Sequence, residues 1–174
     1  MSKTITITIA KAAVIESIKG DTSITGNIDR SVDPVKNAAV SYNEQAGDDD
    51  HHEKKIDLLL RTAVSKFEAE ISEFADGSTG SIDDTIDTTS ITITLVVSDR
   101  YNSGMAKPLA GLAQSYIVNM SLFGWWNSIK PDFAKGFASL AADALVYVRK
   151  CFTKTAPSTS TSSYSDVTGS VTQS

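Results

Sequence analysis

Two stretches of the chain alternate threonine with a branched apolar residue. The first covers residues 3–9 and the second covers residues 91–97. Alternation with a period of two is typical of a half-buried strand. Such strands can pair within the chain or with strands of a neighbouring copy, because exposed edges favour pairing. The apolar positions, which we take as candidate interface residues, are Ile5, Ile7, Ile9, Ile91, Ile93 and Leu95.

Residues 53–75 have a different spacing, in which apolar residues recur every three or four positions. This spacing predicts an amphipathic helix with glutamates on its opposite side. A shorter apolar pattern predicts a helix over residues 10–19, which Gly20 would end. The apolar face of the longer helix comprises Ile56, Leu59, Leu60, Ala63, Val64, Phe67, Ile71 and Phe74.

Two further helices are predicted over residues 108–129 and 131–152, each beginning at a proline. We expect them to form an antiparallel hairpin, with Trp125 and Trp126 near its corner. Broad apolar faces of this kind must pack on the domain or on a neighbouring chain, so Trp125, Trp126, Phe133 and Phe137 are also candidate interface residues. The predicted buried face of the second helix is Phe133, Phe137, Leu140, Ala141, Ala144, Val148 and Phe152.

The remaining segments are polar. Residues 21–47 predict a long arm with one short element near residues 35–42, and residues 76–90 predict an acidic turn. Residues 153–174 are rich in Ser and Thr and predict a flexible tail, because they cannot bury enough apolar surface to become ordered. We therefore expect one domain over residues 1–152, with a long loop at 20–50. The predicted class is α+β, mainly α, with three to four helices and a small β-hairpin or two Ile/Thr strands.

Composition excludes several classes of function. The formal net charge of -5 argues against a protein that binds nucleic acid by neutralising phosphates. The single cysteine, Cys151, cannot form an internal disulfide and is expected to be a buried or half-buried small side chain. We also expect no secretory signal and no segment long enough to cross a membrane.

The cluster from Asp48 to Glu53 is the best candidate for chemistry. Carboxylates and imidazoles are metal ligands, but Asp50 and Glu53 also fit a helix start with a capping box. His51 and His52 would diverge by about 100° on a helix, so the helix start is favoured over a metal site. No phosphate-binding loop, nucleophile elbow or zinc motif occurs in the sequence. We therefore expect no enzyme activity, no catalytic residue, no metal and no cofactor, and we expect Arg100 and Tyr101 to contact solvent or a partner.

Residues Ser115 to Phe152, SYIVNMSLFGWWNSIKPDFAKGFASLAADALVYVRKCF, carry a resemblance. A helix ending near a tryptophan precedes a short turn and an alanine-rich helix that ends in a basic pair. This arrangement resembles small structural proteins of tailed phages and prophages of Bacteroides-type bacteria. It also resembles, more loosely, the head–tail connector, or adaptor, proteins that form rings under the portal of tailed phages.

The resemblance implies a structural virion protein, assembled in the host cytoplasm and present as an oligomeric ring of about twelve copies between portal and tail. Portal and tail proteins would be its neighbours, and DNA would pass through the lumen without specific binding. Two alternatives are a tail-completion or tail-terminator ring protein, which we expect to be richer in sheet, and a small phage-encoded binding protein that is absent from the virion.

Overall fold

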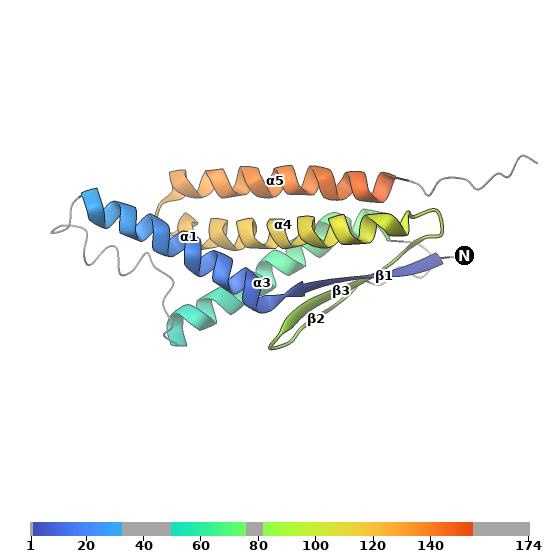
Figure 1. Ribbon diagram of the computed structural model, residues 1–174, viewed down its shortest axis with the longest axis horizontal. Coiled ribbons are helices and arrows are strands. Elements are labelled where there is room, and N and C mark those ends of the chain that lie inside the picture. The colour runs from blue at the N-terminus through green and yellow to red at the C-terminus, as the bar shows by residue number, and fades with distance from the viewer. Residues whose placement is uncertain (1, 33–49, 76–81, 155–174) are drawn as a thin grey trace, which may run out of the picture.

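The computed structural model describes residues 2–32, 50–75 and 82–154, and the predicted tail lies almost entirely outside them (Figure 1). The fold is α+β and mainly helical, which confirms the predicted class. In chain order the elements are β1 (Ser2–Ala10), α1 (Lys11–Val32), α3 (Asp50–Ile71), the short 3-10 helix η1 (Ser72–Phe74), β2 (Ile82–Ile86), β3 (Ser90–Ser98), the 3-10 helix η2 (Ser103–Met105), α4 (Ala106–Asn127) and α5 (Pro131–Thr153).

The three strands form one antiparallel sheet in the order β1-β3-β2. The two Ile/Thr strands pair within the chain, with Ile7 opposite Ile93 at the middle of the ladder. Strand β2 lies within the segment predicted to be an acidic turn, so that prediction is wrong for residues 82–86. Its two adjacent aspartates hide the alternation, yet Ile82 and Ile86 pair opposite core residues of β3, which is sufficient for an edge strand.

Helix α4 occupies the centre of the molecule, between α5 on one side and the sheet with α1 and α3 on the other (Figure 1). Its buried residues occur on several sides of the helix, as expected for a helix with several neighbours, while Gly111 and Ser115 in its first half are exposed. Because α4 contacts the sheet, α1, α3 and α5, it connects the sheet to the outer helix through one continuous core. The buried residues are Leu109, Ala113, Tyr116, Ile117, Ser121, Leu122, Trp125 and Trp126.

Helix α1 is longer than the sequence predicts. It continues through Gly20 to Val32, so the prediction that Gly20 ends it is wrong. Val14, Ile18 and Thr22 are fully buried at four-residue intervals, and this packing outweighs the cost of about 1 kcal/mol for glycine inside a helix. The first part of the predicted arm is therefore helical, and residues 33–49, with the predicted short element, lie outside the described residues.

Helix α5 packs antiparallel along α4, as predicted (Figure 1). The side that faces α4 carries mostly small residues, namely Ala134, Ala141, Ala144, Val148 and Cys151. Burial of Cys151 confirms the prediction for that residue, and desolvation raises the pKa of its thiol. Arg149 near the end of α5 forms ion pairs with Glu70 of α3 at 3.0 Å and with Glu73 of η1 at 3.3 Å. Within the described ranges, no helix is both long and apolar enough to span a bilayer.

Candidate functional site

The apolar faces of β1 and β3 were predicted to contact a neighbouring copy. The structure instead places them in the core of the chain, where their exposed fractions are 9% or less. They are covered because the sheet packs its isoleucine face against the helical layer. The prediction is therefore wrong for these faces in the folded chain. The residues concerned are Ile5, Ile7, Ile9, Ile91, Ile93 and Leu95.

Trp125 and Trp126 are also fully buried, so their predicted role as interface residues is wrong. The His52 ring packs edge-on against Trp125 at 5.5 Å, and the Lys55 ammonium lies 4.2 Å from the centre of the Trp125 ring. Trp126 meets the Phe133 ring at 5.2 Å. The tryptophan pair thus joins the start of α3 to the corner of the α4–α5 hairpin.

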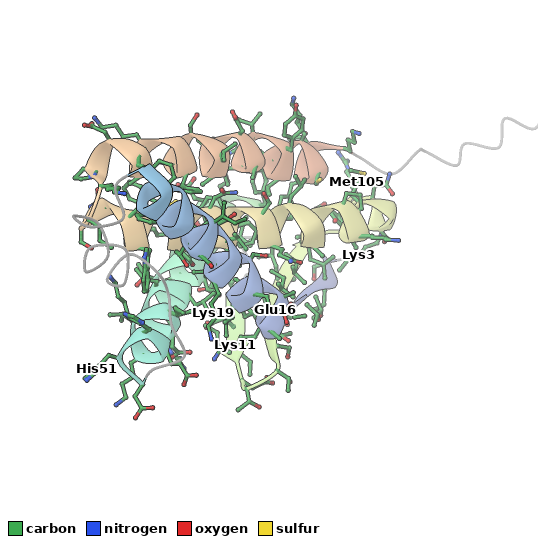
Figure 2. The ribbon with its side chains drawn as sticks, turned by 60° about the vertical axis from the view of Figure 1, so that its left-hand side comes forward. Lys3, Lys11, Glu16, Lys19, His51 and Met105 are labelled. Atoms are coloured by element: carbon green, nitrogen blue, oxygen red, sulfur yellow. The ribbon has the colours of Figure 1, made fainter. Side chains whose placement is uncertain are left out.

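The start of α3 was the candidate for chemistry. Asp50 and Glu53 lie in its first turn, where acidic side chains favour the positive end of the helix dipole. His52 packs on Trp125, while Figure 2 shows His51 at the outer end of α3, pointing away from α1. Over residues 2–32, 50–75 and 82–154, no three His, Cys, Asp or Glu side chains come together as metal ligands.

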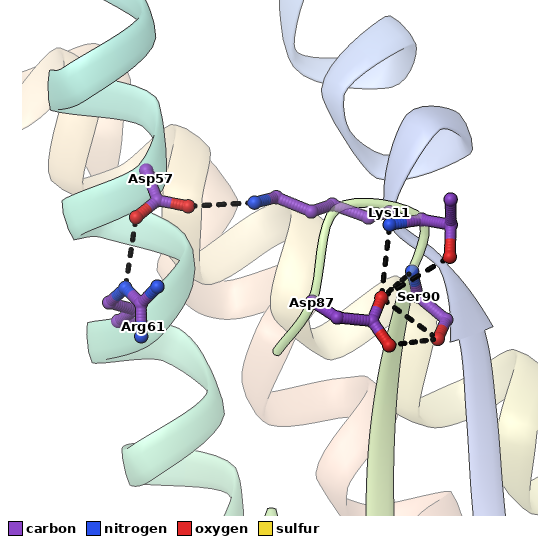
Figure 3. Close-up of polar contacts among 6 residues, drawn as sticks. Lys11, Asp57, Arg61, Asp87 and Ser90 are labelled. Carbon is purple, nitrogen blue, oxygen red and sulfur yellow. Dashed lines mark hydrogen bonds and ion pairs between the residues drawn. The ribbon is translucent and has the colours of Figure 1, made fainter. Parts of the chain in front are cut away.

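A cleft of about 500 Å³ opens between the first turns of α1 and α3 and the β2–β3 turn. Figure 2 shows Lys11 and Lys19 on the side of α1 that faces α3. Lys11 crosses the cleft and donates to the Asp57 carboxylate at 2.8 Å, while Arg61 donates to the other oxygen of the same carboxylate at 2.9 Å (Figure 3). These two bonds hold the pKa of Asp57 below its ordinary value. The cleft is lined by Lys11, Ile15, Lys19, Glu53, Lys54, Ile56, Asp57 and Thr88.

The position of Lys11 in the cleft is fixed by backbone contacts. Its N–H donates to the Thr89 carbonyl at 3.0 Å, so the first turn of α1 is attached to the β2–β3 turn. That turn is closed by Asp87, whose carboxylate accepts bonds from the Ser90 and Thr89 N–H groups (Figure 3). These bonds lower the pKa of Asp87. The paired charges can hold α1 against α3, and they bring no nucleophile next to a base.

Tyr101 was expected to contact solvent or a partner, and that prediction is wrong because its ring is 4% exposed. It packs beside Phe152, and burial raises the pKa of its hydroxyl. Lys3 donates to its backbone carbonyl at 3.3 Å, which attaches the first residues of β1 to the loop before α4. Arg100 remains exposed.

Most of the exposed large apolar side chains among the described residues lie on α5, and two others are Ile24 on α1 and Leu58 on α3. Phe133, Leu140 and Tyr147 are 43%, 53% and 56% exposed, although the sequence placed Phe133 and Leu140 on the buried face. Val146 is 50% exposed on another side of the helix, about 100° from Tyr147, whereas Phe137 is half-buried. Phe133, Leu140 and Tyr147 follow one another at intervals of seven residues. That interval was a signal in the sequence that was missed, because it places the three side chains on one side of the helix.

We call this surface the outer face of α5. It contains these three apolar residues. It also contains, three positions after each of them, an exposed residue on the same side of the helix. At Gly136 an added Cβ would meet nothing within 4 Å, so the surface is open there. Lys150 places its ammonium 4.6 Å from the centre of the Tyr147 ring. The outer face of α5 comprises Phe133, Gly136, Leu140, Asp143, Tyr147 and Lys150.

Comparison of the chain with protein-family models, with curated protein sequences and with solved structures gives no match.

Proposed function

We propose that this chain is a structural protein that acts by assembly, as a head–tail connector subunit in the particle of a tailed phage. The observation that supports an assembly role is the outer face of α5. Its three large apolar side chains stay about half exposed in a row, while Ala134, Ala141 and Val148 on an adjoining side of the helix are buried against α4. A continuous apolar surface on an otherwise well-packed protein typically marks an interaction site.

The connector role draws on the resemblance of residues 115–152 to phage structural proteins. A mainly helical fold supports it over the tail-completion or tail-terminator alternative, which we expect to contain more strand than helix. The net charge of -5 suits a ring around a DNA conduit, because like charge keeps the passing duplex from binding to the wall. On this proposal portal and tail proteins are the neighbours, and the protein carries no catalytic residue.

A second candidate is a small phage-encoded binding protein that acts outside the virion. The cleft between α1 and α3 favours this alternative, because it offers charged side chains around a volume of about 500 Å³. Ion pairing between Lys11 and Asp57 already spans that cleft, so a ligand would have to compete with it. We therefore rank this candidate second.

The test is to ask whether the protein is part of the particle. Mass spectrometry of purified virions should detect it in multiple copies per particle. A Leu140→Ser variant should enter particles less efficiently than a Leu58→Ser variant. Leu58 on α3 is 65% exposed and Leu140 is 53% exposed, so the control removes a leucine at least as exposed from a different surface. Virions that lack the protein would overturn the connector role and leave the binding-protein candidate.

A further inference from the structure

From the outer face of α5 we infer that the free protein pairs with a second copy of itself, through two α5 helices that run antiparallel about a two-fold axis. This inference rests on the proposed assembly role, because it takes the outer face of α5 as a subunit contact. It adds the identity of the partner and the geometry of the contact, which the connector role does not supply.

The spacing of the face selects a helix as the partner. Phe133, Leu140 and Tyr147 occupy one position of a seven-residue repeat, and Gly136, Asp143 and Lys150 occupy the position three residues later. Alternating steps of three and four residues form the seam along which two helices pack side by side. Helix α5 has 23 residues, so the seam extends over about 35 Å, or three repeats.

The residues of the face complement one another when the second helix is antiparallel. A two-fold axis between residues 141 and 142 places Tyr147 of one copy opposite Gly136 of the other, where the structure leaves open space for a ring. The same axis places Phe133 opposite Lys150, which allows a cation–π contact. Leu140 then lies opposite Asp143, close to the axis. One large residue faces one small or polar residue at each level.

Charge at the two ends of α5 also selects the antiparallel direction. Asp132 lies in the first turn and Lys150 lies in the last turn. Asp132 is paired with Lys135 in its own helix, yet its side chain is 96% exposed and remains available to a partner. An antiparallel pair places each Asp132 close to Lys150 of the partner copy. The two helix dipoles then point in opposite directions, which is favourable. A parallel pair would bring Asp132 against Asp132 and Lys150 against Lys150.

The size of the face sets the expected strength. A strip about 35 Å long and about 10 Å wide buries roughly 700 Å² over both copies, which is less than the ~1,200 Å² of a small stable interface. The pair is therefore weak and reversible, with a dissociation constant in the micromolar range or above. A two-fold contact closes on itself, so this pair is the form of the free protein before a ring assembles.

Sedimentation velocity over a range of protein concentrations tests the inference. We expect a monomer–dimer equilibrium that Leu140→Ser weakens at least tenfold, while Leu58→Ser on α3 leaves it unchanged. Both leucines are more than half exposed, so neither change should prevent folding, and circular dichroism of each variant checks this. A protein that stays monomeric at about 1 mM would overturn the inference, as would dimers that Leu140→Ser does not weaken.

A charge exchange tests the direction of the two helices. Asp132→Lys and Lys150→Asp should each weaken pairing several-fold, because each creates like charges across the antiparallel contact. The double variant Asp132→Lys/Lys150→Asp should restore pairing to near the original strength. Single variants that pair as well as the original protein would indicate parallel helices, and a double variant that stays weak would indicate that α5 docks on some other surface. Either result overturns the inference.

The position of the axis has its own consequence. Asp143 of each copy lies within two residues of the axis, so the two carboxylates face one another across the contact. Asp143→Asn should therefore strengthen pairing several-fold, and a weakened dimer would contradict the proposed axis.

The outcomes of these experiments also separate this inference from the connector role. Dimers of a protein absent from virions would overturn only the connector role, and a virion protein that is monomeric in solution would overturn only the pairing.

Discussion

Helices α4 and α5 are neighbours of 22 and 23 residues, and they differ in how many sides are covered. Helix α4 contacts the sheet, α1, α3 and α5, and it carries large buried side chains such as Leu122 and Trp126 on several sides. Helix α5 lies along α4, and Arg149 near its C-terminal end pairs with Glu70 of α3. A helix with one neighbour along most of its length can bury one narrow stripe, so the rest of its apolar surface remains for a partner.

The largest expected effect is the difference in stability loss between a leucine-to-alanine change on α4 and one on α5. Leu122 on α4 is 1% exposed, so Leu122→Ala should lower the free energy of unfolding by about 2–5 kcal/mol through lost contacts and a cavity. Leu140 on α5 is 53% exposed, and Leu140→Ala should cost under about 1 kcal/mol. Urea unfolding measures both values, at protein concentrations low enough that association contributes nothing.

Equal losses at the two positions would contradict the comparison, because they would mean that Leu140 is as well packed as Leu122. A large loss at Leu140 that disappears on dilution would have a different meaning. It would show that the stability of α5 comes from a second copy, which mass action makes dependent on concentration.

Sequence patterns were sufficient for elements whose residues alternate or recur regularly. The strands of Ile7 and Ile93 and the helices that begin near Pro108 and Pro131 were predicted within a few residues of their observed bounds. Local patterns failed where a tertiary contact decides the outcome. Helix α1 continues past Gly20 because Ile18 before the glycine and Thr22 after it are both buried. Strand β2 forms because β3 provides a strand with which it can pair.

The candidate site was harder to predict for a related reason. The sequence shows that the strand isoleucines, Trp126 and Leu140 are apolar, but exposure depends on how many neighbours each element has. The isoleucines lie under the helical layer and are buried, whereas Leu140 has no second helix beside it and is exposed. The seven-residue interval from Phe133 to Leu140 and Tyr147 is present in the sequence, but it does not show which side of the helix is covered.

Replacing one glycine on each helix by alanine should change stability by an intermediate amount, with opposite signs on α4 and α5. At Gly124 on α4, an added Cβ would lie 2.5 Å from Leu59 Cδ2, so Gly124→Ala should destabilise the protein by roughly 1 kcal/mol after the gain in helix propensity is subtracted. At Gly136 on α5 the added Cβ meets nothing within 4 Å, and Gly136→Ala should stabilise the monomer by about 1 kcal/mol. Thermal unfolding at low concentration compares the two.

Gly111→Ala is the matched control for Gly136→Ala. Gly111 lies on α4, and an added Cβ there also meets nothing within 4 Å, so Gly111→Ala should stabilise the monomer to a similar extent. Only Gly136→Ala should also weaken the α5 pair, because it narrows the space for the partner's Tyr147. Identical association constants for the two variants would contradict that placement.

The smallest expected effect concerns the ion pair that holds α1 against α3 on the covered side of α4. Lys11, and after it Arg61, lowers the pKa of Asp57 from its ordinary 3.8. The contribution of Asp57 to stability is therefore present above pH 3.8 and is lost as the pH falls through the lowered value. Asp57 is 37% exposed, so Asp57→Asn should cost less than about 1 kcal/mol at pH 7. The deficit against the original protein should shrink as urea unfolding is repeated below pH 3.8. A deficit of Asp57→Asn that stays constant below pH 3.8 would contradict a role for the bond between Lys11 and Asp57 in the acid sensitivity.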